Sequence, residues 1–124
     1  MPSGPGDKQH LFAILIEPLA VDGYGSQPMV LMVPVCTLHE GLNAETSCVL
    51  DPGDHPFIQR QSFLDYRFSR LEQVSHIEKM VQQGQYTVKE PFDRQVLSRI
   101  VSGALVSRRI SREYKKLLEQ ILFP

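Results

Sequence analysis

The sequence predicts an α+β fold in which a small, strongly bent antiparallel sheet, formed by residues 10 to about 71, is covered by C-terminal helices. Three observations support this class. Apolar runs with many β-branched residues fill the first half of the chain, turn residues separate these runs, and apolar residues at helical spacing follow residue 74. With 124 residues, 42% of them hydrophobic and 22% charged, the chain has the size and composition of a single globular domain.

Within this single domain, 1–124, we expect a loose arm over residues 1–9, a β-rich part over 10–74 and a helical part over 75–124. Two prolines and two glycines fall within the first six residues, and they oppose regular structure there. The β-rich part contains four predicted strands. Their ranges are His10–Ile16, Met29–Leu38, Thr46–Leu50 and Phe63–Leu71.

Three of these strands have specific expectations. The continuous apolar run His10–Ile16 is typical of a strand that is covered on both faces. Pro34 lacks a backbone N–H, so it predicts that Met29–Leu38 lies at a sheet edge or contains a bulge. In Phe63–Leu71 apolar and polar residues alternate, which places Leu64, Tyr66 and Phe68 toward the core.

Helical signals follow in the second half. Ser75 begins a capping box for a first helix, and Tyr86–Val88 predicts a short strand after it. Pro91 stands where a first helical residue is expected, ahead of a second helix over 92–106. Ser111 is placed to cap a third helix, whose apolar side indicates either core packing or an interface with a partner.

Charge, hydropathy and cysteine content indicate in which compartment the protein is found. The chain carries a net charge of -1, divided into about -6 for residues 1–58 and +5 for the remainder. The longest apolar run, Leu11–Ile16, is too short to span a bilayer, and no signal-peptide pattern precedes it, so we expect a cytoplasmic protein without a membrane partner. Cys36 and Cys48 are then expected to be buried free thiols, although a disulfide between neighbouring strands would suit an exported protein.

The most unusual segment is the turn over residues 51–58, which reads Asp-Pro-Gly-Asp-His-Pro-Phe-Ile. Proline and glycine at its second and third positions predict a tight turn. On this turn Asp54 could orient His55 as a general acid or base. Alternatively, Asp54 caps backbone donors of its own turn while His55 bonds a neighbouring loop, and the sequence leaves both arrangements open.

Three arginines follow the turn, namely Arg60, Arg67 and Arg70. An arginine fork binds phosphate oxygens in a bidentate manner, so these residues are candidates for contacting nucleic acid beside His55. Alternatively, they form ion pairs with Asp65 and Glu72 on an exposed strand face.

The sequence gives little support for metal binding, nucleotide binding or serine-hydrolase chemistry. The histidines and cysteines do not occur at zinc-site spacing, and no phosphate-binding glycine loop or nucleophile-elbow serine is present. We therefore expect neither a metal site nor a bound cofactor.

Residues Cys48–Ile58 resemble the signature Cys-x-Leu-x-Pro-Gly-Asp-His-Pro-Phe-Ile of small bacterial proteins. More distantly, the order of elements over about Leu11–Ile77 resembles the PemK/MazF growth-inhibitor family. This resemblance implies an SH3-like β-barrel that dimerises and acts as a sequence-specific, metal-independent endoribonuclease. The toxins of this family have messenger RNA and a small antitoxin protein as partners.

The resemblance extends to single positions. Gln27 stands where the family carries a catalytic arginine, Thr37 falls where the family places a catalytic threonine or serine, and Arg67 matches an arginine of a later strand. Loss of such an arginine commonly costs about two to three orders of magnitude in rate.

These features give two functional hypotheses. The first is a toxin-like ribonuclease and homodimer, in which His55 and Asp54 act as acid or base, Arg67 holds phosphate and Thr37 positions the substrate. The second is a non-catalytic module with the same barrel, which binds a protein or an RNA through the surface around Asp54, His55 and Arg67.

Overall fold

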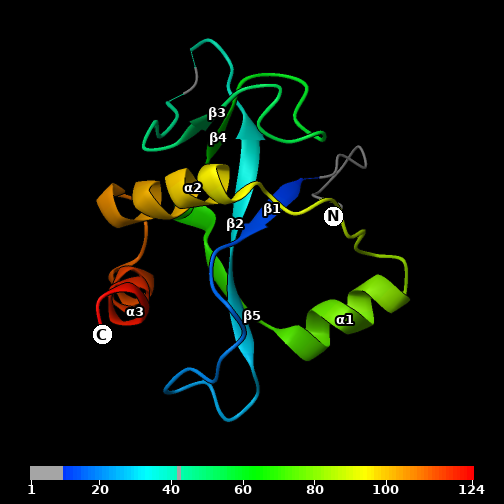
Figure 1. Cartoon of the computed structure of the whole chain (residues 1–124), viewed down its shortest axis with the longest axis vertical. Coiled ribbons are helices and arrows are strands. Elements are labelled where there is room, and N and C mark those ends of the chain that lie inside the picture. Colours follow the sequence, from blue (N-terminus) through cyan, green and yellow to red (C-terminus); the bar gives the residue numbers. More distant parts are fainter. Residues whose placement is uncertain (1–9, 42) are drawn as a thin grey trace.

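The computed structural model of the protein describes residues 10–41 and 43–124, so the expected arm at 1–9 lies outside the described residues. Among the described residues, five antiparallel strands form one open sheet, and three helices follow it (Figure 1). The elements are β1 (Leu11–Ile14), β2 (Met29–Thr37), β3 (Val49–Leu50), β4 (Ser62–Leu64), the 3-10 helix η1 (Tyr66–Phe68), β5 (Arg70–Gln73), α1 (Val74–Gln82), α2 (Arg94–Val106) and α3 (Arg112–Leu122). The predicted α+β class is confirmed, with the strands forming a small open sheet.

Strand β2 is the centre of the sheet. It pairs with β1 along one edge and with β4 and β5, one after the other, along the opposite edge. Pro34 therefore lies in a central strand, and the expected edge or bulge position is wrong. The carbonyl of Pro34 accepts a hydrogen bond of 3.0 Å from the Asp65 N–H, so its ring nitrogen faces the same edge. On this edge Pro34 faces η1, which lies between the segments β4 and β5 that pair with β2. The N–H that proline lacks is therefore not needed for pairing with either strand.

The continuous strand predicted for Phe63–Leu71 is also wrong. The chain leaves β4 at Leu64, turns through η1 and resumes as β5 at Arg70. Leu64 and Tyr66 are buried as expected, but Asp65 is buried as well and Phe68 is 58% exposed. Alternation fails here because the 3-10 turn rotates the side chains out of the two-residue period of a strand.

The hydrophobic core lies between the sheet and α2, which extends from near β2 toward α3 (Figure 1). Tyr66 anchors the two layers, because its hydroxyl donates a 2.6 Å hydrogen bond to the carbonyl of Ile100 within α2. The helix approaches closely at Gly103, where a Cβ atom would lie 2.5 Å from the Tyr66 hydroxyl oxygen. A side chain at residue 103 would therefore push the layers apart.

Several element boundaries differ from the predictions. Strand β1 is an edge strand whose Ile14 is 45% exposed, so the expected cover on both of its faces is wrong. Helix α1 follows β5 directly, without a cap from Ser75, and Tyr86–Val88 forms no strand. Helix α2 begins three residues after Pro91. The cap of α3 is confirmed, since the Ser111 hydroxyl accepts a hydrogen bond from the Tyr114 N–H.

Candidate functional site

His55 is an interior residue. Its side chain is only 3% exposed, and both ring nitrogens have partners: Nδ1 accepts from the Phe57 N–H at 3.0 Å, while Nε2 lies 2.6 Å from the Glu90 carbonyl oxygen. Both bonds form with the proton on Nε2, which then donates to that carbonyl. The ring also packs against Phe92, with the centroids 4.7 Å apart. The expectation that the imidazole is exposed beside Arg67 is therefore wrong, because the linker from α1 to α2 covers it.

Asp54 does not orient His55. One carboxylate oxygen accepts a 2.7 Å hydrogen bond from the Asp51 N–H, and the other forms a 3.2 Å ion pair with Arg99 of α2. The predicted tight turn is present, with Gly53 at a positive φ of 112° and a bond from the Asp54 N–H to the Asp51 carbonyl. Of the two arrangements left open by the sequence, the structure has the one in which Asp54 caps its own turn and His55 bonds a neighbouring segment.

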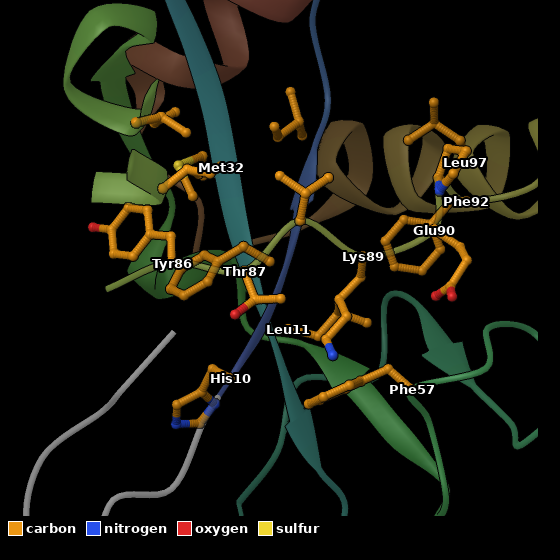
Figure 2. Close-up of a pocket in the computed structure, with 16 residues that line it drawn as sticks. His10, Leu11, Met32, Phe57, Tyr86, Thr87, Lys89, Glu90, Phe92 and Leu97 are labelled. Atoms are coloured by element: carbon orange, nitrogen blue, oxygen red, sulfur yellow. The ribbon is translucent and has the colours of Figure 1, made fainter. Parts of the chain in front are cut away.

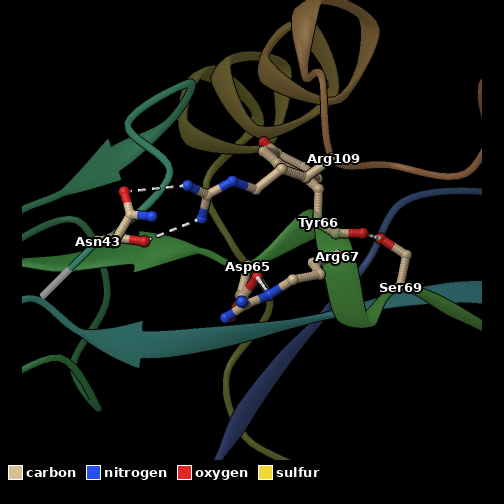
Figure 3. Close-up of polar contacts among 6 residues, drawn as sticks. All are labelled: Asn43, Asp65, Tyr66, Arg67, Ser69 and Arg109. Atoms are coloured by element: carbon tan, nitrogen blue, oxygen red, sulfur yellow. Dashed lines mark hydrogen bonds and ion pairs between the residues drawn. The ribbon is translucent and has the colours of Figure 1, made fainter.

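Arg67 lies on η1, where it forms two hydrogen bonds with the buried carboxylate of Asp65, of 3.0 and 3.3 Å (Figure 3). This carboxylate raises the pKa of the Arg67 guanidinium above its ordinary value. The guanidinium carbon also lies 4.7 Å from the ring centroid of Phe68. Arg67 therefore has an anionic partner within the protein, as expected from the alternative in which the arginines pair with Asp65 and Glu72.

The other predicted site residues are separate from His55 in their contacts. Arg70 pairs with Glu72 at 3.2 Å and lies over the ring of Phe12. Arg60 is exposed in the segment before β4, and Thr37 is exposed at the end of β2, opposite Ser62. Among the described residues, the hydrogen bonds of His55 go to Phe57 and Glu90 and those of Arg67 go to Asp65, so no bond joins either side chain to another member of the predicted site.

The two cysteines are free thiols, with Cys48 buried and Cys36 partly buried. Burial raises the pKa of Cys36 from 9.0 to about 11. Burial also raises the pKa of Cys48. A raised pKa keeps both thiols protonated near neutral pH, which makes them poor nucleophiles.

A hollow of about 330 Å³ lies beside β1, and we call it the β1 hollow (Figure 2). Its walls come from β1, β2, α1, the beginning of α2 and the linker between the two helices. The lining is mostly apolar, and includes Met32, Phe57, Ile77, Val81 and Leu97. Concave apolar sites of this size with few polar groups are typical of ligand and partner binding.

The conspicuous turn of the sequence builds one wall of this hollow. His55 bonds the carbonyl of Glu90 and packs on Phe92, and both of these linker residues line the hollow together with Phe57 from the turn itself. Lys89 extends over the ring of Phe57, with its ammonium 5.3 Å from the ring centroid. Sequence reasoning missed this site because its wall is irregular backbone, whose position depends on a hydrogen bond between residues 35 positions apart.

In the part of the chain that the structure describes, no three His, Cys, Asp or Glu side chains gather as a metal site, and no helix is long and apolar enough to cross a membrane. Comparison with known proteins adds no assignment: no family model, curated protein or solved structure matches the chain.

Proposed function

We propose that the chain is a non-catalytic binding module, and that its partner is a protein with an apolar segment that enters the β1 hollow. The observation that carries this proposal is that His55 is buried and that both of its ring nitrogens have hydrogen-bond partners within the protein. A general acid or base must reach the proton it transfers. The imidazole instead holds the Glu90 carbonyl and the Phe57 N–H, and so supports the wall of a binding hollow.

The sequence agrees with this choice. Gln27, at the position matched to the family's catalytic arginine, carries no charge that could stabilise a developing phosphorane. A phosphate group would have to compete with the Asp65 carboxylate for the Arg67 guanidinium. A ribonuclease would therefore lack an accessible imidazole at His55 and would have its Arg67 guanidinium already paired with a carboxylate.

The proposal has a catalytic test. Purified protein is incubated with a long single-stranded RNA, with and without a chelator, over a wide pH range. We expect the RNA to remain intact. Chelator-resistant cleavage by the protein that is lost in His55→Asn, at unchanged fold, would restore the ribonuclease hypothesis instead.

The proposal also has a binding test. Peptides are selected from a displayed random library for binding to the protein, and then compared on two variants. Val81→Trp fills the hollow from α1, whereas Gln82→Trp places the same ring on an exposed residue outside the hollow. We expect apolar peptides that bind the parent and Gln82→Trp but not Val81→Trp. If no selected peptide distinguishes these two variants, the hollow is not the binding site.

RNA binding without cleavage is the second candidate, because η1 presents an exposed aromatic ring beside a guanidinium. Phe68 is 58% exposed and Arg67 lies over it. Such a pair can stack an unpaired base. Fluorescence anisotropy with a labelled single-stranded RNA tests this candidate, and Phe68→Ala should weaken binding about tenfold if the ring stacks a base, since such a contact is worth about 1–3 kcal/mol.

The homodimer implied by the family resemblance remains a prediction. Light scattering after size exclusion gives the mass directly. A stable dimer at micromolar concentration supports the family likeness, and a monomer of 14.1 kDa counts against it.

A further inference from the structure

The partner segment that enters the β1 hollow, if the proposed function holds, has a definite mode of binding. We propose that it pairs as an additional β-strand with the outer edge of β1 and places an acidic side chain beside Lys89. This inference rests on the proposed function and specifies the chemistry of the partner.

The hollow follows the outer edge of β1. Side chains alternate between the two faces of a strand, so Leu11 points to one face of the sheet while Phe12 and Ile14 point to the other. All three line the hollow, as do Leu97 from α2 and Met32 from β2. A hollow bordered by residues of both faces lies around the strand's edge. It therefore gives access to backbone as well as to side chains.

The backbone of this edge has hydrogen-bonding groups to offer. Leu15 donates to the carbonyl of Leu31, and the register continues in steps of two residues through Ala13 with Val33 and Leu11 with Val35. Phe12 and Ile14, which lie between these residues, belong to pairs that form no hydrogen bonds with β2. The pairing of Phe12 with Pro34 agrees with this, because proline has no N–H to donate. The N–H and C=O groups of Phe12 and Ile14 thus point away from β2.

Within the described residues no strand pairs with this edge of β1, since β2 is its sheet neighbour. The linker passes close enough to line the hollow, but within the described residues its backbone hydrogen bonds go to the helices at its two ends. The N–H groups of Gln85 and Tyr86 both donate to the carbonyl of Met80, and the Asp93 carbonyl accepts from the Leu97 N–H. An unpaired edge is a template for an incoming strand, and main-chain hydrogen bonds then supply affinity while alternate side chains fill the adjoining pockets.

The charge of the hollow specifies one further feature of the partner. Lys89 contacts the ring of Phe57, and no carboxylate among the described residues lies within ion-pairing distance of its ammonium. Figure 2 shows this ammonium near the His10 end of β1, while the carboxylate of Glu90 points to a different side. An incoming strand with an acidic side chain at that end gains a charge-assisted contact with this exposed ammonium.

The test uses a peptide obtained by the selection described above, acetylated and amidated at its ends so that its only carboxylate is a side chain. Two N-methylated forms are made, one at the odd and one at the even positions of its apolar segment. Because only every second residue bonds an edge strand, one form should bind at least about tenfold more weakly than the parent peptide and the other should bind nearly as well.

Two protein variants complete the test. Ile14→Pro removes an outward N–H without removing a bond to β2, and Ile14→Ala is its side-chain control. We expect the proline variant to lose binding at least tenfold more than the alanine variant. Lys89→Ala should weaken the acidic peptide about fivefold and leave its glutamine analogue unchanged.

The outcomes separate the two claims. If a hollow-dependent peptide binds equally well in both N-methylated forms, or if Ile14→Pro and Ile14→Ala bind alike, strand pairing is refuted while the binding module stands. If Lys89→Ala weakens the acidic and glutamine peptides equally, the acidic contact is refuted. If no peptide depends on the hollow, the proposed function fails as well.

Discussion

His55 gives the sharpest prediction, since a catalytic and a structural imidazole respond differently to the same substitution. In the structure the ring is buried, accepts from the Phe57 N–H and donates to the Glu90 carbonyl. His55→Ala removes both partners and the packing on Phe92. We therefore expect His55→Ala to lower the free energy of unfolding.

The size of this loss follows from the two backbone groups that His55→Ala leaves without their partner, the Phe57 N–H and the Glu90 carbonyl. A buried group left without its hydrogen bond costs about 1–3 kcal/mol. The Phe57 N–H is in a partly buried residue, whereas Glu90 is exposed and water can reach its carbonyl once the ring is gone. We therefore assign most of the penalty to Phe57 and expect His55→Ala to lower the free energy of unfolding by about 2–4 kcal/mol.

Two further variants separate the bonds. His55→Asn keeps an acceptor near the position of Nδ1 and so preserves the bond from Phe57, whereas His55→Gln reaches toward the Glu90 carbonyl with an amide donor. Urea denaturation should place both between the parent and the alanine variant. Hydrogen exchange in residues 85–93 should accelerate in the asparagine variant, because its linker has lost the anchor at Glu90. An alanine variant within about 0.5 kcal/mol of the parent would refute this reasoning.

The remaining predictions concern the core, the thiols and the entry to α3. Gly103→Ala should destabilise the protein by at least about 2 kcal/mol in urea titrations, because its Cβ would lie 2.5 Å from the Tyr66 hydroxyl oxygen, whereas Ser102→Ala on the exposed side of the same helix should be neutral or slightly stabilising. Cys36, with a pKa of about 11 against an ordinary 9.0, should react with iodoacetamide at pH 7.5 about 100-fold more slowly than an unperturbed thiol; reaction at the ordinary rate would contradict its burial. Because the folded state holds the thiol proton more tightly, the stability that Cys36 contributes is complete below about pH 9 and is lost as the pH rises toward 11. The urea midpoints of the parent and of Cys36→Ser should therefore differ by an amount that changes between pH 9 and 11. Ser107→Ala should cost about 2–3 kcal/mol, since the hydroxyl donates to the buried Glu45 carboxylate and accepts from two backbone N–H groups ahead of α3; an unchanged urea midpoint would show that water replaces it.

The parts of the fold that sequence patterns could predict are those with local causes. Ser111 caps α3 through a bond to a residue three positions away, and the turn at Gly53 needs only its own backbone conformation. Both were predictable because neither depends on a distant segment. The ion pairs of Arg67 with Asp65 and of Arg70 with Glu72 are likewise two residues apart.

The failures share a non-local cause. Period-two alternation across residues 63–71 predicts one strand, but the break after Leu64 is coupled to Pro34 in the neighbouring strand, which has no donor to offer at that point. His55 looked catalytic because a histidine beside an aspartate on a rigid turn is compatible with proton transfer. Its actual partner, the Glu90 carbonyl, lies in a linker whose path no local pattern describes.

This relation between turn and linker also explains why residues so conspicuous in the sequence need not act on a substrate. The turn that includes Phe57 is fixed at one side by the ion pair that Arg99 of α2 forms with Asp54, and at the other side by His55. It therefore sets the position of the linker relative to the edge of β1. Substitutions at His55 should alter peptide binding through the shape of the hollow even though the imidazole touches no partner. If His55→Gln keeps the linker in place, as its retained amide donor predicts, it should bind the selected peptide nearly as well as the parent, while His55→Ala should bind it at least about tenfold more weakly.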